Sequence, residues 1–183
     1  MTLLAFSLFI CMVPFSVALS SSIYRCIEWK ETFRMALVFA LFQSGMAAIG
    51  WGIGYVIREM FFDMKVPVAL LLLLLVAIRL FFEALKKDKR LRIVVTEETS
   101  ILVSFGLMTS MLTALLGIAI GMLFAGVIVL ASCVFGLVFL LTIAGIRLGK
   151  LGMMGLGKIA ELAGSIGLLI TGIVILLQFL EII

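Results

Sequence analysis

The side chains able to bind a solute are almost all neutral and lie inside long apolar stretches. Hydroxyl and amide oxygens suit small polar solutes, whereas thiol and thioether sulfur suit softer metal ions. A hard divalent cation prefers carboxylate and carbonyl oxygens, and the middle of these stretches contains no Asp or Glu. The predicted pathway residues of this kind are Cys11, Met12, Gln43, Ser44, Thr109, Ser110, Met111 and Thr113.

Pro14 adds backbone chemistry to the first apolar stretch. Proline has no N–H, so it leaves the carbonyl of Ile10 without its helical donor. In hydrocarbon that carbonyl needs a partner or a cavity. Pro14 therefore predicts either a kink that turns carbonyls toward a central pathway or a packed helix that is merely kinked.

Few charged residues fall within the apolar stretches. Arg79 and Glu83 are one helical turn apart and can pair, and Glu161 lies in the first turn of its predicted helix, where the helix dipole favours a carboxylate. Together with Lys158 they are predicted to have a structural or gating role. Structural pairing is a sufficient explanation for each, and a role in coupling transport is the alternative.

Several kinds of reactive site are excluded by composition. The chain has no His, and its three cysteines, Cys11, Cys26 and Cys133, have no paired spacing. Zinc, haem and His-based catalytic sites need such residues. No enzyme and no cofactor is expected, although exchange between Cys11 and Cys133 is a minor alternative.

The elements that position these residues are apolar helices. Of the 183 residues 65% are apolar, and only 14 are Lys or Arg and 10 Asp or Glu. This composition is far more apolar than that of a soluble domain. Because a membrane span takes about 20 residues, the chain is predicted to be an all-α membrane protein with six transmembrane helices. They are expected at about 3–20, 35–57, 66–85, 100–117, 122–146 and 159–180, with a tight turn at 117–121.

The basic residues indicate orientation. Eleven of them lie in the first, third and fifth loops between the predicted spans. Two, Arg58 and Lys65, lie on the opposite side of the membrane. Lys and Arg are retained in the cytoplasm, so a multi-pass inner-membrane protein with both termini outside is expected. A cleaved signal peptide over 1–20 is the alternative, but no Lys or Arg precedes Arg25. The bilayer is the expected partner, with no nucleic acid; the basic loop 86–99 is read as a retained loop or an anionic-lipid site.

An internal repeat is predicted within this single membrane domain. The segment 11–15 aligns with 110–114 at an offset of 99 residues. Three spans leave the chain on the other side of the membrane, so 1–85 and 100–183 would form a 3+3 inverted repeat, the alternating-access architecture. Glycines four residues apart predict close helix packing: Gly50 and Gly54, Gly117 and Gly121, Gly145 and Gly149.

Four stretches resemble the manganese efflux pump family, which is related to the lysine-exporter superfamily. They are Phe39–Gly54, Arg79–Ala84, Thr109–Ala114 and Gly157–Gly164. The resemblance implies a six-span transporter whose first and fourth spans carry metal-binding aspartates, with a glutamate in the second. The matching positions here hold Val13, Leu112 and Gln43, which makes the chain a divergent member and leaves its metal ligands unknown.

Two functions follow from these observations. The first is export of Mn²⁺, a softer metal ion or another small solute by alternating access, with Val13 and Leu112 added to the predicted pathway by the resemblance. The second is a non-transporting membrane subunit or regulator on the same scaffold, because all three acidic positions are lost.

Overall fold

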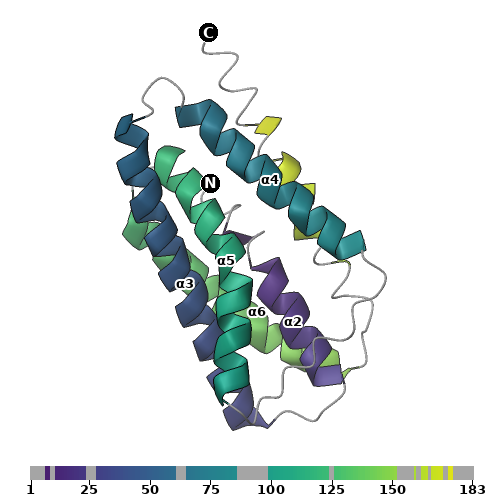
Figure 1. Ribbon diagram of the computed structural model, residues 1–183. Helices are drawn as coiled ribbons and strands as arrows, with labels where there is room; N and C mark the ends of the chain where they lie inside the picture. Colours follow the sequence, from purple (N-terminus) through teal and green to yellow (C-terminus); the bar gives the residue numbers. More distant parts are fainter. Residues whose placement is uncertain are drawn as a thin grey trace.

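The computed structural model consists of packed helices (Figure 1). It describes residues 7–8, 11–23, 28–60, 65–85, 99–123, 126–151, 159, 162–164, 166–170 and 173–174, and no strand occurs among them. The five labelled helices are α2 (Met12–Ile23), α3 (Trp29–Met60), α4 (Lys65–Leu85), α5 (Thr99–Leu123) and α6 (Val127–Lys150).

Apolar length identifies the membrane-crossing helices. Among the described residues, three segments are long and apolar enough to cross a membrane, Trp29–Glu59, Leu102–Leu123 and Val127–Lys150, and Val66–Phe82 is a shorter apolar helix. The chain is therefore an all-helical, multi-pass membrane protein. Residues 86–98, which make up nearly all of the predicted basic loop, lie outside the described residues.

Helix α3 extends beyond the span predicted for it at both ends. The prediction followed the apolar run, and the helix continues into the charged residues on either side of that run. Its 32 residues extend about 48 Å, beyond a hydrocarbon core of about 30 Å. At its start the Glu28 amide donates to the Glu31 carboxylate (3.2 Å), and the Thr32 hydroxyl donates to the Glu28 carbonyl (2.9 Å). The first bond satisfies an amide at the helix start, where amides have no intrahelical acceptor, and the Glu28 carbonyl also accepts the first helical bond, from the Thr32 amide (2.9 Å). The helix therefore begins in the charged region before the apolar segment.

The turn predicted at 117–121 is wrong. Helix α5 continues through this segment to Leu123, and the backbone change comes at Gly126, whose φ of 124° precedes the start of α6. Glycines four residues apart fit a turn or a helix contact equally well in sequence. Gly117 and Gly121 serve the helix contact. Helix α3 likewise runs without interruption through the glycine-rich segment Gly50–Gly54.

Contacts between helices fix their directions. Gly50 and Gly54 of α3 meet Ala114 and Ile118 of α5 in rising order, so these helices are parallel, and they lie side by side in Figure 1. Helices α3 and α6 are antiparallel, because Arg147 near the end of α6 lies over the ring of Trp29 at the start of α3.

One end of the bundle is basic. The start of α3 and the end of α6 meet there, and Lys30, Arg34, Arg147 and Lys150 belong to these two helix ends. Arg58 lies at the other end of α3. We call the first of these the basic end. Its four basic residues are all among those that the charge count assigns to the cytoplasmic side, and the orientation itself stays a prediction.

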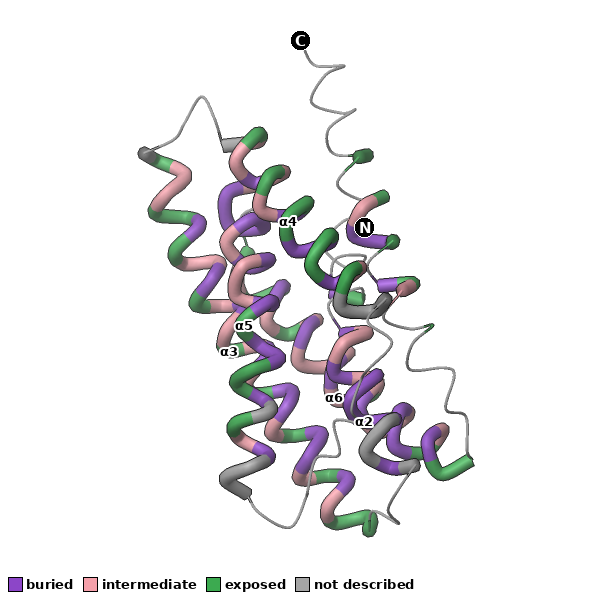
Figure 2. The backbone as a smooth tube through the Cα atoms, turned by 45° about the vertical axis from the view of Figure 1, so that its right-hand side comes forward, coloured by how far each residue is buried: buried purple, intermediate pink, exposed green. Residues whose placement is uncertain are grey.

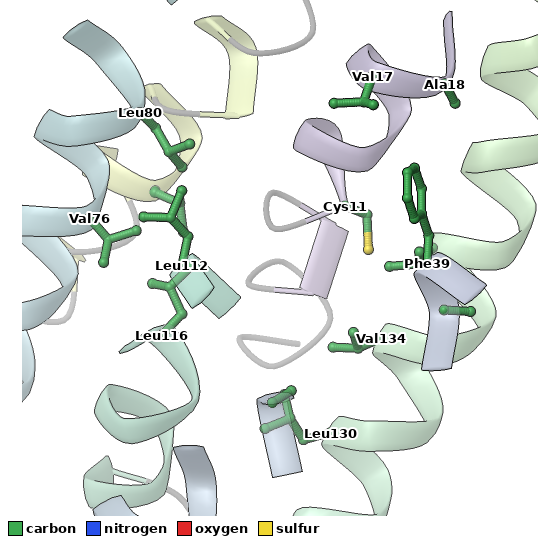
Figure 3. Packing of buried hydrophobic residues seen from close by; sticks show 14 of the residues in the cluster. Cys11, Val17, Ala18, Phe39, Val76, Leu80, Leu112, Leu116, Leu130 and Val134 are labelled. Carbon is green, nitrogen blue, oxygen red and sulfur yellow. The ribbon is translucent and has the colours of Figure 1, made fainter. Parts of the chain in front are cut away.

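The buried residues form one main apolar cluster between the helices. Figure 2 shows buried positions where helices face one another and exposed positions on their outer faces. In Figure 3, Leu112 and Leu116 of α5 face Val76 and Leu80 of α4. The exposed outer faces are rich in large apolar side chains, as expected of helices that face lipid.

Candidate functional site

A buried polar cluster joins α3 to α5 within their apolar segments. The side chains of Gln43, Thr109 and Thr113 are at most 5% exposed. The Gln43 amide Nε2 donates to Thr109 Oγ1 (3.4 Å), and the Thr113 hydroxyl donates to Gln43 Oε1. The two threonines are one turn apart on α5, so both ends of a single carboxamide are held between them. We call these three residues the Gln43 cluster.

Hydroxyl groups in and beside this cluster also bond to carbonyls of their own helices. Thr109 Oγ1 also donates to the Gly106 carbonyl (3.1 Å), and Ser110 Oγ donates to the Leu107 carbonyl (2.9 Å). Ser44, predicted to join the pathway, donates to the Leu41 carbonyl (3.3 Å). The Gln43 cluster is thus neutral and hydrogen-bonded, and it offers amide and hydroxyl oxygens.

Glycines bring the backbones of α3 and α5 together beside this cluster. A Cβ placed on Gly50 would collide with the carbonyl of Ala114, and one on Gly54 with the carbonyl of Ile118. In return, a Cβ on Gly117 would lie 2.6 Å from the Ala47 carbonyl oxygen. The close packing predicted from the four-residue glycine spacing is confirmed here.

The α2·α6 interface repeats this register. A Cβ on Gly145 would lie 2.8 Å from the Phe15 carbonyl oxygen, and one on Gly149 would collide with the Leu19 carbonyl. Gly145 and Gly149 follow Gly50 and Gly54 by 95 residues, while Phe15 and Leu19 precede Ala114 and Ile118 by 99. Both glycine contacts of one interface therefore have a counterpart in the other. The offset of 99 residues between the contacted carbonyls is the one already seen in the sequence repeat.

These offsets assign counterparts to the Gln43 cluster, and they identify Val138 and Thr142, which the sequence alone did not single out. Val138 is the counterpart of Gln43 and Pro14 that of Thr113, so the second interface has no Gln43 cluster. One turn beyond Val138, the fully buried Thr142 hydroxyl has no hydrogen-bond partner among the described residues. Aligning the two glycine pairs at 95 residues is the signal that would have found them.

The first predicted span is interrupted close to Pro14. The structure describes Ser7 and Leu8 as helical, and α2 begins at Met12, which makes Pro14 its third residue. The amides of Cys11 and Phe15 donate to the carbonyls of Ser7 and Cys11, each at 3.2 Å and four residues back, as in an α-helix. Because Ile10 lies outside the described residues, the predicted kink at Pro14 stays a prediction.

The remaining predicted pathway residues differ in how far they are buried. Leu112 is 8% exposed and belongs to the main apolar cluster, whereas Met111 is 60% exposed on the outer face of α5. Cys11 is fully buried, and Met12 and Val13 are half-buried. Figure 3 shows Cys11 in the same apolar cluster as Phe39. Their predicted part in a pathway stays a prediction.

The predicted charged group is described only in part. Arg79 is exposed on α4, where it borders an apolar surface groove with Leu71, Leu74, Leu75 and Ile78. The side chain of Glu83, and Lys158 and Glu161 as a whole, lie outside the described residues. Pairing of Arg79 with Glu83 stays a prediction.

No carboxylate-based metal site is present in the described part of the chain. The described residues contain no group of three or more His, Cys, Asp or Glu placed to hold a metal ion. The neutral oxygens of the Gln43 cluster fit a divalent cation poorly, because they supply no negative charge.

Comparison with known proteins finds a family and several relatives that are similar to this chain. The family described as "Putative manganese efflux pump" matches residues 26–176. A relative of that name from Nitratidesulfovibrio vulgaris is 31% identical over 96% of this chain and 89% of its own, and one from Crocosphaera subtropica is 28% identical over 90% and 88%. One from Pseudomonas savastanoi is 31% identical over 82% and 81%. No solved structure matches the chain.

The match extends over most of the sequence, and the relatives are matched over most of theirs. Their names describe efflux pumps, which are membrane transporters. With an all-helical fold and helices apolar enough to cross a membrane, the sequence and the structure agree on one scaffold. The chain belongs to the manganese efflux pump family.

Proposed function

We propose that this protein is a membrane transporter that exports a small solute by alternating access between two inverted halves, 1–85 and 100–183. The observation that carries the proposal is the repeated glycine register. Gly50 and Gly54 against α5 have the counterparts Gly145 and Gly149 against α2. Chance packing gives no reason for both glycine contacts to recur at fixed offsets.

The directions of the helices support inversion of the repeat. Helix α2 is parallel to α6, because Gly145 and Gly149 meet Phe15 and Leu19 in rising order. Since α6 is antiparallel to α3 and α3 is parallel to α5, the equivalent helices α2 and α5 run in opposite directions. That is the relation expected of a 3+3 inverted repeat in a transporter.

Manganese is the first solute to test, because the relatives are named manganese efflux pumps. The centre of the chain differs from a site for a hard cation, since the Gln43 cluster is neutral. We therefore propose a solute that needs little charge compensation, or a softer metal ion that uses Cys11 and Met12.

A second candidate function rests on the packing of Leu112. This residue is 8% exposed and faces Val76 and Leu80 in an apolar contact (Figure 3). A pathway residue should border a polar cavity, whereas packing of this kind is typical of a structural core. A non-transporting subunit or regulator on the same scaffold would have such a centre.

Manganese efflux separates the two functions. The native chain would be expressed in a bacterium that lacks its own manganese exporter, and cell-associated manganese would be measured under manganese stress. A second strain would carry Val13→Asp, Leu112→Asp and Gln43→Glu together, and a control strain Leu140→Met on the exposed face of α6, outside the predicted pathway. Membrane accumulation is measured for every strain.

Each outcome decides between the candidates. Lowered manganese in the native and control strains supports manganese export by this chain. Lowered manganese only in the triple variant supports a scaffold that has lost the activity. If neither the native chain nor the triple variant lowers manganese, challenge with copper, zinc and cadmium tests export of a softer ion. No protection against any of these metals supports the non-transporting function.

A further inference from the structure

We propose that the moving units of this protein are two helix pairs, α3 with α5 and α2 with α6. Each pair combines one helix from 1–85 with one from 100–183, so neither sequence half moves as a rigid body. We call them the α3–α5 unit and the α2–α6 unit. The proposal rests on the inverted repeat proposed above, and it does not depend on which solute is transported.

The α3–α5 unit is held by backbone contact from both sides. Gly50 and Gly54 of α3 and Gly117 and Gly121 of α5 each place their missing Cβ against the backbone of the other helix. Such interlocked backbones cannot slide past one another without separating first. The Gln43 cluster adds two hydrogen bonds across the same interface, between side chains that are buried.

The α2–α6 unit is held by backbone contact from one side, at the glycines of α6. Gly145 and Gly149 lie against the carbonyls of Phe15 and Leu19. The hydroxyl of Ser22 lies in the contact with Gly149 and donates to the Leu19 carbonyl (3.0 Å). This interface therefore also brings backbones into contact, and Val138 stands where its counterpart has Gln43.

The contact between the two units has a different character. Phe33 of α3 meets Phe139 of α6 edge to face, with ring centroids 5.4 Å apart, and the Arg147 guanidinium lies 4.5 Å from the ring centroid of Trp29. No described glycine of α3 or α6 is blocked by the other of these two helices, and Gly45, Gly52 and Gly136 face open space.

Side chains in rotameric contact permit a small relative rotation, whereas interlocked backbones do not. Sliding of packed helices by small side-chain changes is a known mode of domain motion. The α3·α6 contact is therefore the surface on which the two units rock. Because α3 and α6 are equivalent in the proposed repeat, opening one end of the bundle closes the other and leaves both glycine interfaces intact.

Spin labels at the basic end test this arrangement. Lys30 of α3, Ser104 of α5 and Lys150 of α6 all have exposed side chains. In the full chain, Cys11, Cys26 and Cys133 would first be changed to Ala. Two of the chosen positions at a time would then be changed to cysteine and spin-labelled, and the distance between the two labels would be measured by electron paramagnetic resonance in lipid nanodiscs. A Lys30 and Glu59 pair, both on α3 and about 44 Å apart, gives the width expected within one helix.

The two diagnostic pairs give opposite results under the alternatives. Labels at 30 and 104 join different sequence halves but one unit, so a single distribution as narrow as the control is expected. Labels at 104 and 150 join different units within one sequence half, so a broad or two-peaked distribution is expected.

The reverse pattern would overturn the proposal in favour of rigid sequence halves. Two narrow distributions, or two broad ones, would also overturn it. The result is separate from the efflux assay: a chain that shows the expected pattern without exporting manganese keeps its two units and loses only the proposed function.

Discussion

At the α3·α5 interface Gly50 and Gly54 lie against two carbonyls and a buried carboxamide is held between two threonines. At the α2·α6 interface Gly145 and Gly149 make the matching backbone contacts, but the position of the carboxamide is occupied by Val138. The backbone plan is shared and the polar chemistry is not. Small residues thus fix how closely helices approach in lipid, and the side chains around them are free to diverge.

The difference also separates two kinds of buried hydroxyl. Thr113 donates to Gln43, whereas Thr142 has no partner among the described residues. A satisfied polar group in an apolar setting stabilises its interface, and an unsatisfied one costs free energy. The two interfaces should therefore respond in opposite directions to the loss of a hydroxyl.

The largest effect is expected from a carboxylate at Leu112. Its repeat counterpart is Val13, which is half-buried, whereas Leu112 is 8% exposed. Leu112→Asp removes a packed side chain and buries a charge, so we expect a loss of about 3–5 kcal/mol in unfolding free energy. Val13→Asp should cost clearly less. Denaturation in detergent micelles measures both, and equal losses would contradict the assignment of Leu112 to the core.

Alanine in the glycine register comes next. In Gly54→Ala the new Cβ collides with the Ile118 carbonyl, and we expect a loss of about 1–3 kcal/mol. Gly145→Ala should cost less, because its Cβ would lie 2.8 Å from the Phe15 carbonyl oxygen.

Gly52→Ala is the matched control for the glycine register, because nothing lies within 4 Å of its Cβ position. It should raise stability by up to about 1 kcal/mol through helix propensity. Thermal melting of the purified variants in one detergent gives the ranking. Similar melting temperatures for the Gly52 and Gly54 variants would remove the basis for interlocked backbones.

Removal of single hydroxyls follows. Thr113→Val leaves Gln43 Oε1 without its donor, so we expect a loss of about 1–2 kcal/mol in unfolding free energy. Thr142→Val removes a hydroxyl that has no partner in the described part of the chain and should be neutral or stabilising. The same denaturation measurement reports both, and destabilisation of equal size would show that Thr142 has a partner after all.

The smallest effect is the coupling within the Gln43 cluster. A double-mutant cycle with Gln43→Met and Thr113→Val isolates the interaction between the two side chains. Cross-helix hydrogen bonds in membranes average about 0.6 kcal/mol and reach about 1.7, so a coupling in this range is expected. A value of zero would mean that the glycine contacts alone hold the α3–α5 unit together.

The sequence predicted correctly that the described part of the chain is helical and that its spaced glycines lie at helix contacts, because long apolar runs and small residues are visible locally. It located the turn after the fourth span wrongly, since glycines four residues apart do not distinguish a loop from a helix contact. It placed Pro14 inside the first span, and the structure has helical residues at Ser7 and Leu8 before α2 begins at Met12, so the kink at Pro14 remains a prediction. The pathway and the paired charges remain predictions.

By itself the sequence determined that the chain is a membrane protein, which end of the bundle is basic, and that the centre contains no acid. Tertiary structure decided which polar atoms meet: Gln43 pairs with threonines 66 and 70 residues away, while Thr142 meets no partner among the described residues. The physical reason is that such partners come from different helices. Their meeting depends on a register set by backbone contact at glycines, which no single segment contains.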